Sequence, residues 1–255
     1  MPAEKRALIS DIHANLEALT AVLEDISAQG VREVVCLGDI IGYGPDPVAC
    51  LDLVMDRCDL TILGNHDQAA IFDPDGFNPV ALNAIYWTRD QLESGSGGPE
   101  RANRRWDFIG ELPRRHDEGE ILFVHGSPRE PTNEYVFPEH VFETQRMEML
   151  MGRFEQFCFQ GHTHIPGVFT EGGRFLTPHD VDYVMPLAEE KLMINVGSVG
   201  QPRDDDRRAC YVILDTAQRT VRYRRVEYDY QATAGKIHRI PELDDMLGDR
   251  LSRGA

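Results

Sequence analysis

The sequence lacks any apolar run long enough to cross a membrane. A membrane-spanning helix needs about 20 consecutive, mostly apolar residues, and the 255-residue chain contains no such run. A recognisable secretory signal is also missing, because only a short apolar stretch lies between Arg6 and Asp11. We therefore expect a cytoplasmic protein with no membrane partner.

Cysteines are few, and basic residues are outnumbered by acidic ones. The five cysteines are scattered and form no C-x-x-C pair, so we expect buried free thiols in a reducing compartment. Lys and Arg total 26 against 43 Asp and Glu, which gives a formal net charge of −17. Proteins that bind nucleic acid stably usually carry a basic stripe, so no nucleic-acid partner is expected. Bound metal cations would let so acidic a chain attract an anionic substrate.

Short apolar segments alternate with amphipathic ones in the first half of the chain. The predicted strands cover residues 6–10, 33–37 and 60–63, and the predicted helices cover 16–28, 47–55 and 78–92. Alternation of strands and helices predicts a mostly parallel sheet covered by helices. The Gly/Ser-rich segment 94–99 is interpreted as a surface loop and a candidate lid.

The second half is richer in strands. Further strands are predicted over 121–124, 157–160 and 192–196, with a helix around 139–151 and hairpins over 167–176 and 210–226. These strands predict a second sheet packed on the first, so the expected fold class is α/β with two packed mixed β-sheets flanked by helices. We expect residues 1–255 to form a single domain that is helical from 228 and disordered over 248–255.

Five of the predicted strands run directly into a short polar motif. The motifs are D-x-H at 11–13, G-D at 38–39, G-N-H-D at 64–67, H-G at 125–126 and G-H-T-H at 161–164. The carboxyl ends of strands in an open α/β sheet converge on one crevice, so these motifs should meet in space. Any one motif alone is more commonly a turn, but five at strand ends in this order are hard to explain as coincidence.

The side chains in these motifs suit divalent metal ions. The candidate ligands are Asp11, His13, Asp39, Asn65, His125, His162 and His164. Carboxylate, amide and imidazole groups are hard to borderline ligands, and no thiolate is among them. Glycines precede Asp39, Asn65 and His162, and glycine permits tight turns that bring the backbone close to an ion.

The order of the five motifs resembles that of the calcineurin-like metallophosphoesterase superfamily. More narrowly, residues 38–45 (GDIIGYGP), 125–128 (HGSP) and 195–203 (NVGSVGQPR) are similar to a bacterial and archaeal branch of small phosphoesterases. The resemblance implies a four-layer αββα sandwich. Members of that branch are commonly described as phosphodiesterases or diadenosine-tetraphosphatase-like enzymes, often dependent on manganese.

The resemblance also assigns each ligand to one of two metal ions. Asp39 would bridge both ions, and the remaining ligands would divide into Asp11, His13 and His164 for one ion and Asn65, His125 and His162 for the other. Manganese is expected at both positions, with iron, zinc, nickel, cobalt or magnesium as alternatives. Two such ions would activate a hydroxide for attack on phosphorus.

Four residues in or near the motifs are candidates for acting on the substrate. His66 corresponds to the catalytic histidine of the superfamily, as a general acid or as a group that stabilises the phosphoryl oxygens, and Asp67 could orient its imidazole. Arg203 could contact a phosphate bidentately, with an ion pair to the acidic run 204–206 as the alternative. Tyr43 could stack on a nucleobase, although a packed aromatic is the commoner role.

The predicted activity is hydrolysis of phosphodiesters or nucleotide polyphosphates. The expected partner is therefore a small phosphorylated substrate, with a nucleotide as one candidate, and an oligomer is compatible with the sequence. A phosphomonoesterase or protein phosphatase is the main alternative, because the same centre serves both classes. A non-catalytic scaffold and a nuclease are less favoured, since His66 and the full ligand set are present and the chain is acidic.

Overall fold

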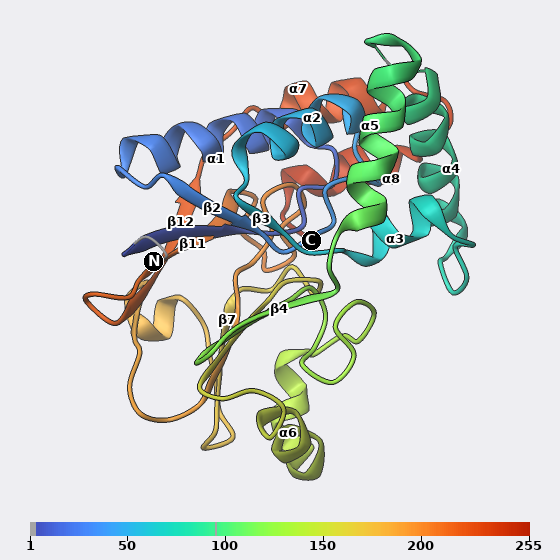
Figure 1. The fold of residues 1–255 in the computed structure, drawn as a ribbon. Coiled ribbons are helices and arrows are strands. Elements are labelled where there is room, and N and C mark those ends of the chain that lie inside the picture. The colour runs from blue at the N-terminus through green and yellow to red at the C-terminus, as the bar shows by residue number, and fades with distance from the viewer. Residues whose placement is uncertain (1–3, 95) are drawn as a thin grey trace.

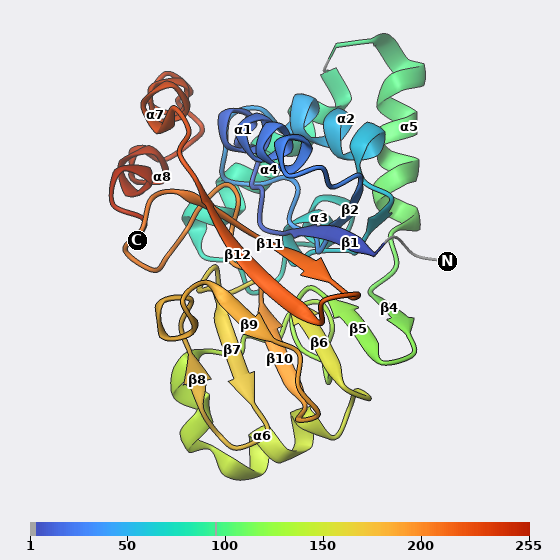
Figure 2. The same ribbon diagram turned by 90° about the vertical axis from the view of Figure 1, so that its left-hand side faces the viewer.

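Two six-stranded mixed sheets form the centre of the structure, a computed structural model that describes residues 4–94 and 96–255 (Figures 1 and 2). The order of strands in the first sheet is β3 (Leu60–Thr61), β2 (Glu33–Cys36), β1 (Lys5–Ile9), β11 (Ala209–Asp215), β12 (Thr220–Val226) and β9 (Val184–Pro186). The first three strands are parallel, and the last three are antiparallel to their neighbours. The β11–β12 pair is the second hairpin predicted from the sequence.

The second sheet has its parallel strands at the centre. The order is β4 (Arg115–Glu118), β5 (Ile121–Val124), β6 (Phe157–Gln160), β10 (Leu192–Asn195), β7 (Gly167–Thr170) and β8 (Phe175–Leu176). Strands β5, β6 and β10 are parallel, whereas β4, β7 and β8 are antiparallel to their neighbours. The β7–β8 pair is the first predicted hairpin.

The pleat of each sheet divides its apolar side chains between two layers of core. In β1, Leu8 packs between the two sheets, whereas Ala7 and Ile9 face helices α1 (Leu16–Ala28) and α2 (Pro47–Arg57). In β10, Ile194 packs between the sheets, and Met193 faces helix α6 (Thr144–Met151). Figure 2 shows the resulting order of helices, first sheet, second sheet and α6. The predicted four-layer sandwich is confirmed.

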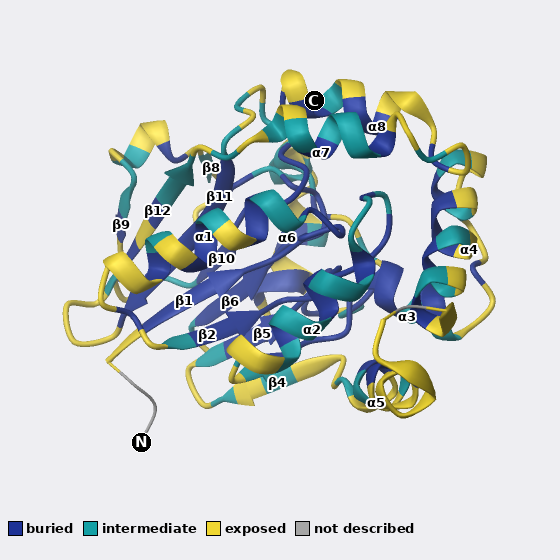
Figure 3. Ribbon diagram, turned by 90° about the horizontal axis from the view of Figure 1, so that it is seen from above, coloured by how far each residue is buried: buried dark blue, intermediate teal, exposed yellow. Residues whose placement is uncertain are grey.

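The remaining helices lie beside the sheets (Figures 1 and 3). They are α3 (Asn65–Ile71), α4 (Pro79–Ser94), α5 (Gly98–Glu111), α7 (Tyr230–Ile237), α8 (Asp245–Asp249) and the 3-10 helices η1 (Pro138–Phe142), η2 (His179–Val181) and η3 (Arg250–Ser252). Within residues 4–94 and 96–255, no helix combines the length and the apolar character needed to span a membrane.

The carboxyl-terminal segment differs from the expectation of disorder over 248–255. Leu247 and Leu251 are buried in a cluster with Ala84 of α4 and Ile237 of α7. The main-chain oxygen of Gly254 accepts a hydrogen bond from the Asp205 amide at 2.9 Å. Burial of apolar side chains offsets the entropy lost on ordering, so this segment is part of the folded structure.

Two boundaries also differ from the sequence prediction. The expected helix over 139–151 is divided into η1 and α6 at Glu143, whose main chain departs from helical geometry with φ −93° and ψ 70°. In the expected loop over 94–99, Gly98 and Pro99 belong to α5, because proline is well accommodated in a first helical turn. Gly95 of that loop lies outside the described residues, and the structure does not test the lid.

Candidate metal centre

Five chain segments bring their polar residues together at the carboxyl ends of the parallel strands. The first sheet supplies the residues after β1 and β2 and at the start of α3, and the second sheet supplies those after β5 and β6. All seven predicted ligands are buried: Asp11, His13, Asp39, Asn65, His125, His162 and His164. The site therefore lies between the two sheets, and neither sheet alone holds the whole set.

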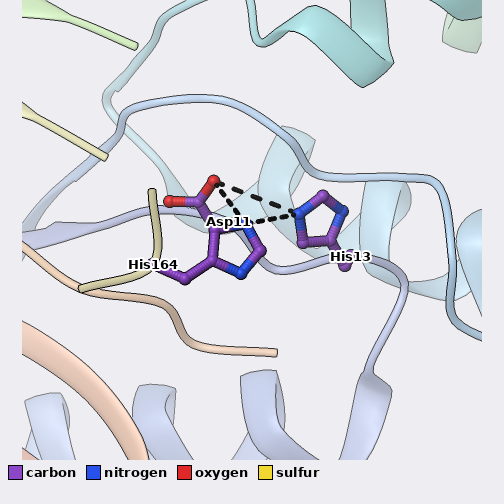
Figure 4. A group of neighbouring side chains, drawn as sticks. All are labelled: Asp11, His13 and His164. Carbon is purple, nitrogen blue, oxygen red and sulfur yellow. Dashed lines mark hydrogen bonds and ion pairs between the residues drawn. The ribbon is translucent and has the colours of Figure 1, made fainter. Parts of the chain in front are cut away.

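The first group of neighbouring side chains consists of Asp11, His13 and His164 (Figure 4). The Oδ1 atom of Asp11 lies 3.3 Å from Nε2 of His164 and 4.0 Å from Nε2 of His13. The two Nε2 atoms are 3.1 Å apart. Three ligand atoms thus face a common point, as a metal ion requires.

The far nitrogen of each imidazole in this group is committed to a main-chain carbonyl. Nδ1 of His13 lies 3.2 Å from the Ile41 oxygen, and Nδ1 of His164 lies 2.6 Å from the Gln201 oxygen. Because a carbonyl can only accept, both Nδ1 atoms carry the proton in the neutral rings, and both Nε2 atoms present lone pairs. Burial lowers the pKa of both histidines, so the neutral forms are favoured. Two lone pairs facing each other beside a carboxylate are stable when a cation lies between them.

The second group consists of Asp39, His125 and His162, with Asn65 beside them. The Nε2 atom of His125 lies 3.4 Å from Oδ2 of Asp39, 3.1 Å from Nδ1 of His162 and 3.2 Å from Oδ1 of Asn65. The same Asp39 oxygen is 3.6 Å from Nε2 of His13 in the first group. A single carboxylate oxygen therefore faces both groups, which is the arrangement that a bridging ligand needs.

Main-chain carbonyls also fix the histidines of the second group. Nδ1 of His125 lies 2.8 Å from the Leu37 oxygen, and Nε2 of His162 lies 3.1 Å from the Asn133 oxygen. Burial opposes a positive charge here, but the Asp39 carboxylate raises the pKa of His125 to about 9. The field of the buried carboxylates thus favours a cation at this point, and a divalent metal ion fits the donor set of both groups.

The backbone is strained at several of these ligands. Asp11, His13, Asp39, His162 and His164 all have positive φ angles, between 47° and 69°. For residues other than glycine this region costs free energy, and such residues gather at functional sites. The turns are also tight, since a Cβ atom added to Gly64 would lie 2.1 Å from the main-chain nitrogen of Asp39.

Comparison with known proteins agrees with this geometry. The family model of the calcineurin-like phosphoesterase superfamily domain matches residues 5–219. The chain belongs to this superfamily. An uncharacterized protein of Methanocaldococcus jannaschii is 37% identical over 257 residues, and the match covers 97% of both chains. The protein is therefore a metal-dependent phosphoesterase, a hydrolase, as the resemblance implied.

Solved structures resemble this phosphoesterase over its full length. A metallophosphoesterase from Sphaerobacter thermophilus has a TM-score of 0.81 and 35% identity, and the match covers 100% of both chains. A hypothetical protein from Pyrococcus horikoshii OT3 has a TM-score of 0.75 and 19% identity, with 98% of both chains covered. The second likeness is one of fold.

His66 of the phosphoesterase lies beside the centre without being fixed by a carbonyl. Its ring centroid is 4.9 Å from that of His13, 4.4 Å from that of Tyr43 and 5.0 Å from that of Phe77. Among the described residues, its buried Nδ1 atom has no hydrogen-bond partner. Its main-chain N–H donates to Oδ1 of Asp39 at 2.8 Å. The ring is therefore placed next to the ligands and is available to a substrate.

Asp67 binds the main chain, which corrects the expectation that it orients the His66 imidazole. Its Oδ2 atom accepts from the amides of Asp39 at 2.8 Å and Gly64 at 3.1 Å. Its Oδ1 atom accepts from the amide of Ile40 at 3.0 Å and from the amide of Ile41 at 3.4 Å. His66 and Asp67 are adjacent in the first turn of α3, and adjacent helical side chains do not face each other. Asp67 thus holds the loop that carries Asp39.

Arg203 lies beside the centre, but its predicted ion-pair alternative is not formed. Its main-chain N–H donates to the carbonyl of His164 at 3.3 Å, and Nη2 donates to Oε1 of Gln201 at 2.8 Å. The acidic run 204–206 pairs with Arg208 and Arg225 instead. Among the described residues, the Arg203 guanidinium therefore has no carboxylate partner.

Two supports of the centre were not predicted. The Asn195 amide donates to the Gly161 carbonyl at 2.7 Å and to the Thr163 hydroxyl at 2.9 Å, and so holds the loop that carries two ligands. The Tyr135 ring stacks on His162, with centroids 3.7 Å apart and planes 19° apart. Asn195 begins the N-V-G-S-V-G segment that resembles related phosphoesterases, so the sequence does single out this residue. The stacking of Tyr135 could not be predicted, because the sequence does not specify which imidazole the ring contacts.

Proposed function

We propose that the chain hydrolyses phosphodiester or nucleotide-polyphosphate bonds of small substrates, with two divalent cations that are manganese in the native enzyme. The observation that carries this proposal is the pair of ligand groups that share one oxygen of Asp39. In the proposed arrangement seven residues hold the cations and His66 acts on the substrate. Participation of both sheets in one site supports the further proposal that residues 1–255 form a single domain, and the five free cysteines support a cytoplasmic location.

Each residue has a separate task in this proposal. When bound, the two cations supply a nucleophilic water of lowered pKa and neutralise charge on the phosphoryl oxygens. Asp39 holds its position because one of its oxygens accepts the His66 amide, at 2.8 Å, while the other faces both ligand groups. The main-chain carbonyls behind the histidines accept from each far nitrogen, so that each near nitrogen of a neutral ring can face a cation. These contacts pre-organise the ligands before any substrate arrives.

His66 is better suited to stabilise phosphoryl oxygens than to protonate a leaving group. Burial lowers the pKa of His66 to about 4. A neutral imidazole can donate one hydrogen bond to a phosphoryl oxygen, whereas protonation of a departing alkoxide needs the imidazolium form. The lowered pKa therefore supports a role for His66 in stabilising the phosphoryl oxygens and not as a general acid.

A pair of chromogenic substrates tests the proposed activity. The manganese-loaded protein is assayed with bis(p-nitrophenyl) phosphate and with p-nitrophenyl phosphate, and kcat/KM is expected to be higher for the diester. A higher value for the monoester would favour the phosphomonoesterase alternative. His179→Asn, which changes an exposed histidine, is the control variant. Absence of turnover of both esters, by protein with full metal content, would favour a non-catalytic scaffold.

A further inference from the structure

Two arginine side chains meet beside the metal centre. Nη2 of Arg203 donates to Oε1 of Gln201 at 2.8 Å, and Nη1 of Arg250 donates to the same oxygen at 3.2 Å. The main-chain oxygen of Gln201 accepts from Nδ1 of His164 at 2.6 Å. One buried glutamine thus joins both guanidinium groups to a residue of the first ligand group.

These two positive charges are not neutralised by acidic side chains. In the described part of the chain, neither Arg203 nor Arg250 forms an ion pair with an Asp or Glu. The Nε atom of Arg203 is buried and has no hydrogen-bond partner there, and Nε of Arg250 donates to the main-chain oxygen of Ala255 at 2.8 Å. In a chain with a net charge of −17, two half-buried guanidinium groups that lack an Asp or Glu partner among the described residues are unusual. Their mutual repulsion would be relieved by an anion.

The pair lies near Tyr43 and His66, since both arginine charges act on Tyr43 and the Arg203 charge acts on His66. Tyr43 lies against the His66 ring, with centroids 4.4 Å apart. The Arg203 charge adds to burial in lowering the pKa of His66 and of His164. The pair therefore flanks the centre on the side of the first ligand group. Arg250 comes from η3, beyond the residues 5–219 matched by the family model.

We propose that Arg203 and Arg250 form a second anion site, which binds a phosphate group next to the one that is hydrolysed. Guanidinium groups present several donors in a fixed plane and pair well with phosphate oxygens. The site would give this phosphoesterase a preference for substrates with two or more linked phosphates over those with one. This inference rests on the proposed function, because it assumes that the scissile phosphate lies at the metal centre.

Calorimetric binding of two non-hydrolysable ligands tests the second site. Methylenediphosphonate and methylphosphonate are titrated into the manganese-loaded protein at saturating manganese, so that chelation by the ligands does not strip the centre. The wild type should bind the diphosphonate at least tenfold more tightly. Arg250→Gln should reduce this ratio roughly tenfold, the size expected for loss of one charge-assisted contact, and Arg203→Gln should act alike. Arg250→Lys should retain part of the preference.

The control is Arg239→Gln, which removes the same charge from an exposed position just after α7 and should leave the ratio unchanged. Circular dichroism verifies the fold of each variant, and Arg250→Lys keeps the test decisive if Arg250→Gln does not fold. An unchanged ratio in Arg250→Gln, or no preference in the wild type, would overturn the second site. Diester hydrolysis with no such preference would reject this inference alone. A diphosphonate preference that depends on Arg250, without hydrolysis of any ester, would uphold the anion site and reject the proposed function.

Discussion

Replacement of Asp67 by Asn tests how the metal loop is held. The carboxylate of Asp67 is fully buried and accepts four main-chain N–H groups, two on each oxygen. An asparagine has one carbonyl oxygen and one NH₂ group. Whichever way the amide is turned, two main-chain donors lose their acceptor and face another donor. The variant is therefore expected to disturb the loop from Asp39 to Ile41.

The size of the effect follows from the number of unpaired donors. Each buried donor without a partner costs about 1–3 kcal/mol, and one of the four contacts is long at 3.4 Å. Removal of the buried charge, which a raised pKa shows to be unfavourable in the folded state, offsets part of this cost. We therefore expect Asp67→Asn to lower the free energy of unfolding by about 1–2 kcal/mol. For a chain of this size, that corresponds to a fall in Tm of roughly 2–8 °C.

The assay is thermal unfolding of the metal-free protein at pH 8. Metal-free protein is used because a change in metal affinity would alter Tm by mass action. The pH is chosen because burial, together with the Asp39 charge, raises the pKa of Asp67 to about 7, so that the carboxylate is ionised at pH 8. Asp75→Asn, at an exposed position of the loop after α3, is the matched control and should leave Tm unchanged. A Tm of Asp67→Asn within about 1 °C of the wild type would refute the role of Asp67 in holding the loop.

Three further outcomes are expected. Replacement of His66 by Asn should lower kcat roughly 10²–10³-fold, with metal content by elemental analysis nearly unchanged; undiminished turnover would remove His66 from the mechanism. Asp39→Asn should reduce the metal content of both positions, because one carboxylate faces both groups, and full occupancy of both would argue against the bridge. The lowered pKa values of His13 and His164 keep their neutral forms at lower pH than an ordinary histidine. At least one metal ion per chain, held by Asp11, His13 and His164, should therefore remain bound as pH falls through about 6.5, and complete loss of metal above that pH would contradict this expectation.

The ligand set could be predicted because strand ends carry a strong signal. Each motif follows an apolar strand, and the carboxyl ends of parallel strands lie at the same edge of a sheet. Asp11 and Asp39 follow neighbouring strands of the first sheet, and His125 and His162 follow neighbouring strands of the second. The strand-end motifs and the order of the strands therefore identify the same ligand residues.

The contacts behind the ligands could not be predicted in the same way. The carbonyls that fix the histidines belong to Leu37, Ile41, Asn133 and Gln201, and every residue has a carbonyl, so residue type gives no signal. The role of Asp67 depended on where α3 begins. The G-N-H-D motif was interpreted as the end of a strand, whereas it opens a helix.

Two elements could not be predicted because residues distant in the sequence determine which of their side chains are buried. Helix α5 buries Ala102, Arg105 and Ile109 at helical spacing, but an arginine on the buried face obscures the apolar period. Arg105 can be buried because its guanidinium pairs with Asp52 through two hydrogen bonds of 2.8 Å. In the carboxyl-terminal segment, Leu247 and Leu251 recur at four-residue spacing, which is typical of a helix. The sequence does not show that Ala84 and Ile237 cover these two side chains.

The most direct test of the two-metal centre is a crystal structure of the manganese-loaded phosphoesterase with data collected at the manganese absorption edge. A two-metal centre predicts two anomalous difference peaks roughly 3.5–4 Å apart, with Oδ2 of Asp39 between them. Asp11, His13 and His164 should surround one peak, and Asn65, His125 and His162 the other. A single peak, or two peaks of which neither is bound by Asp39, would contradict it.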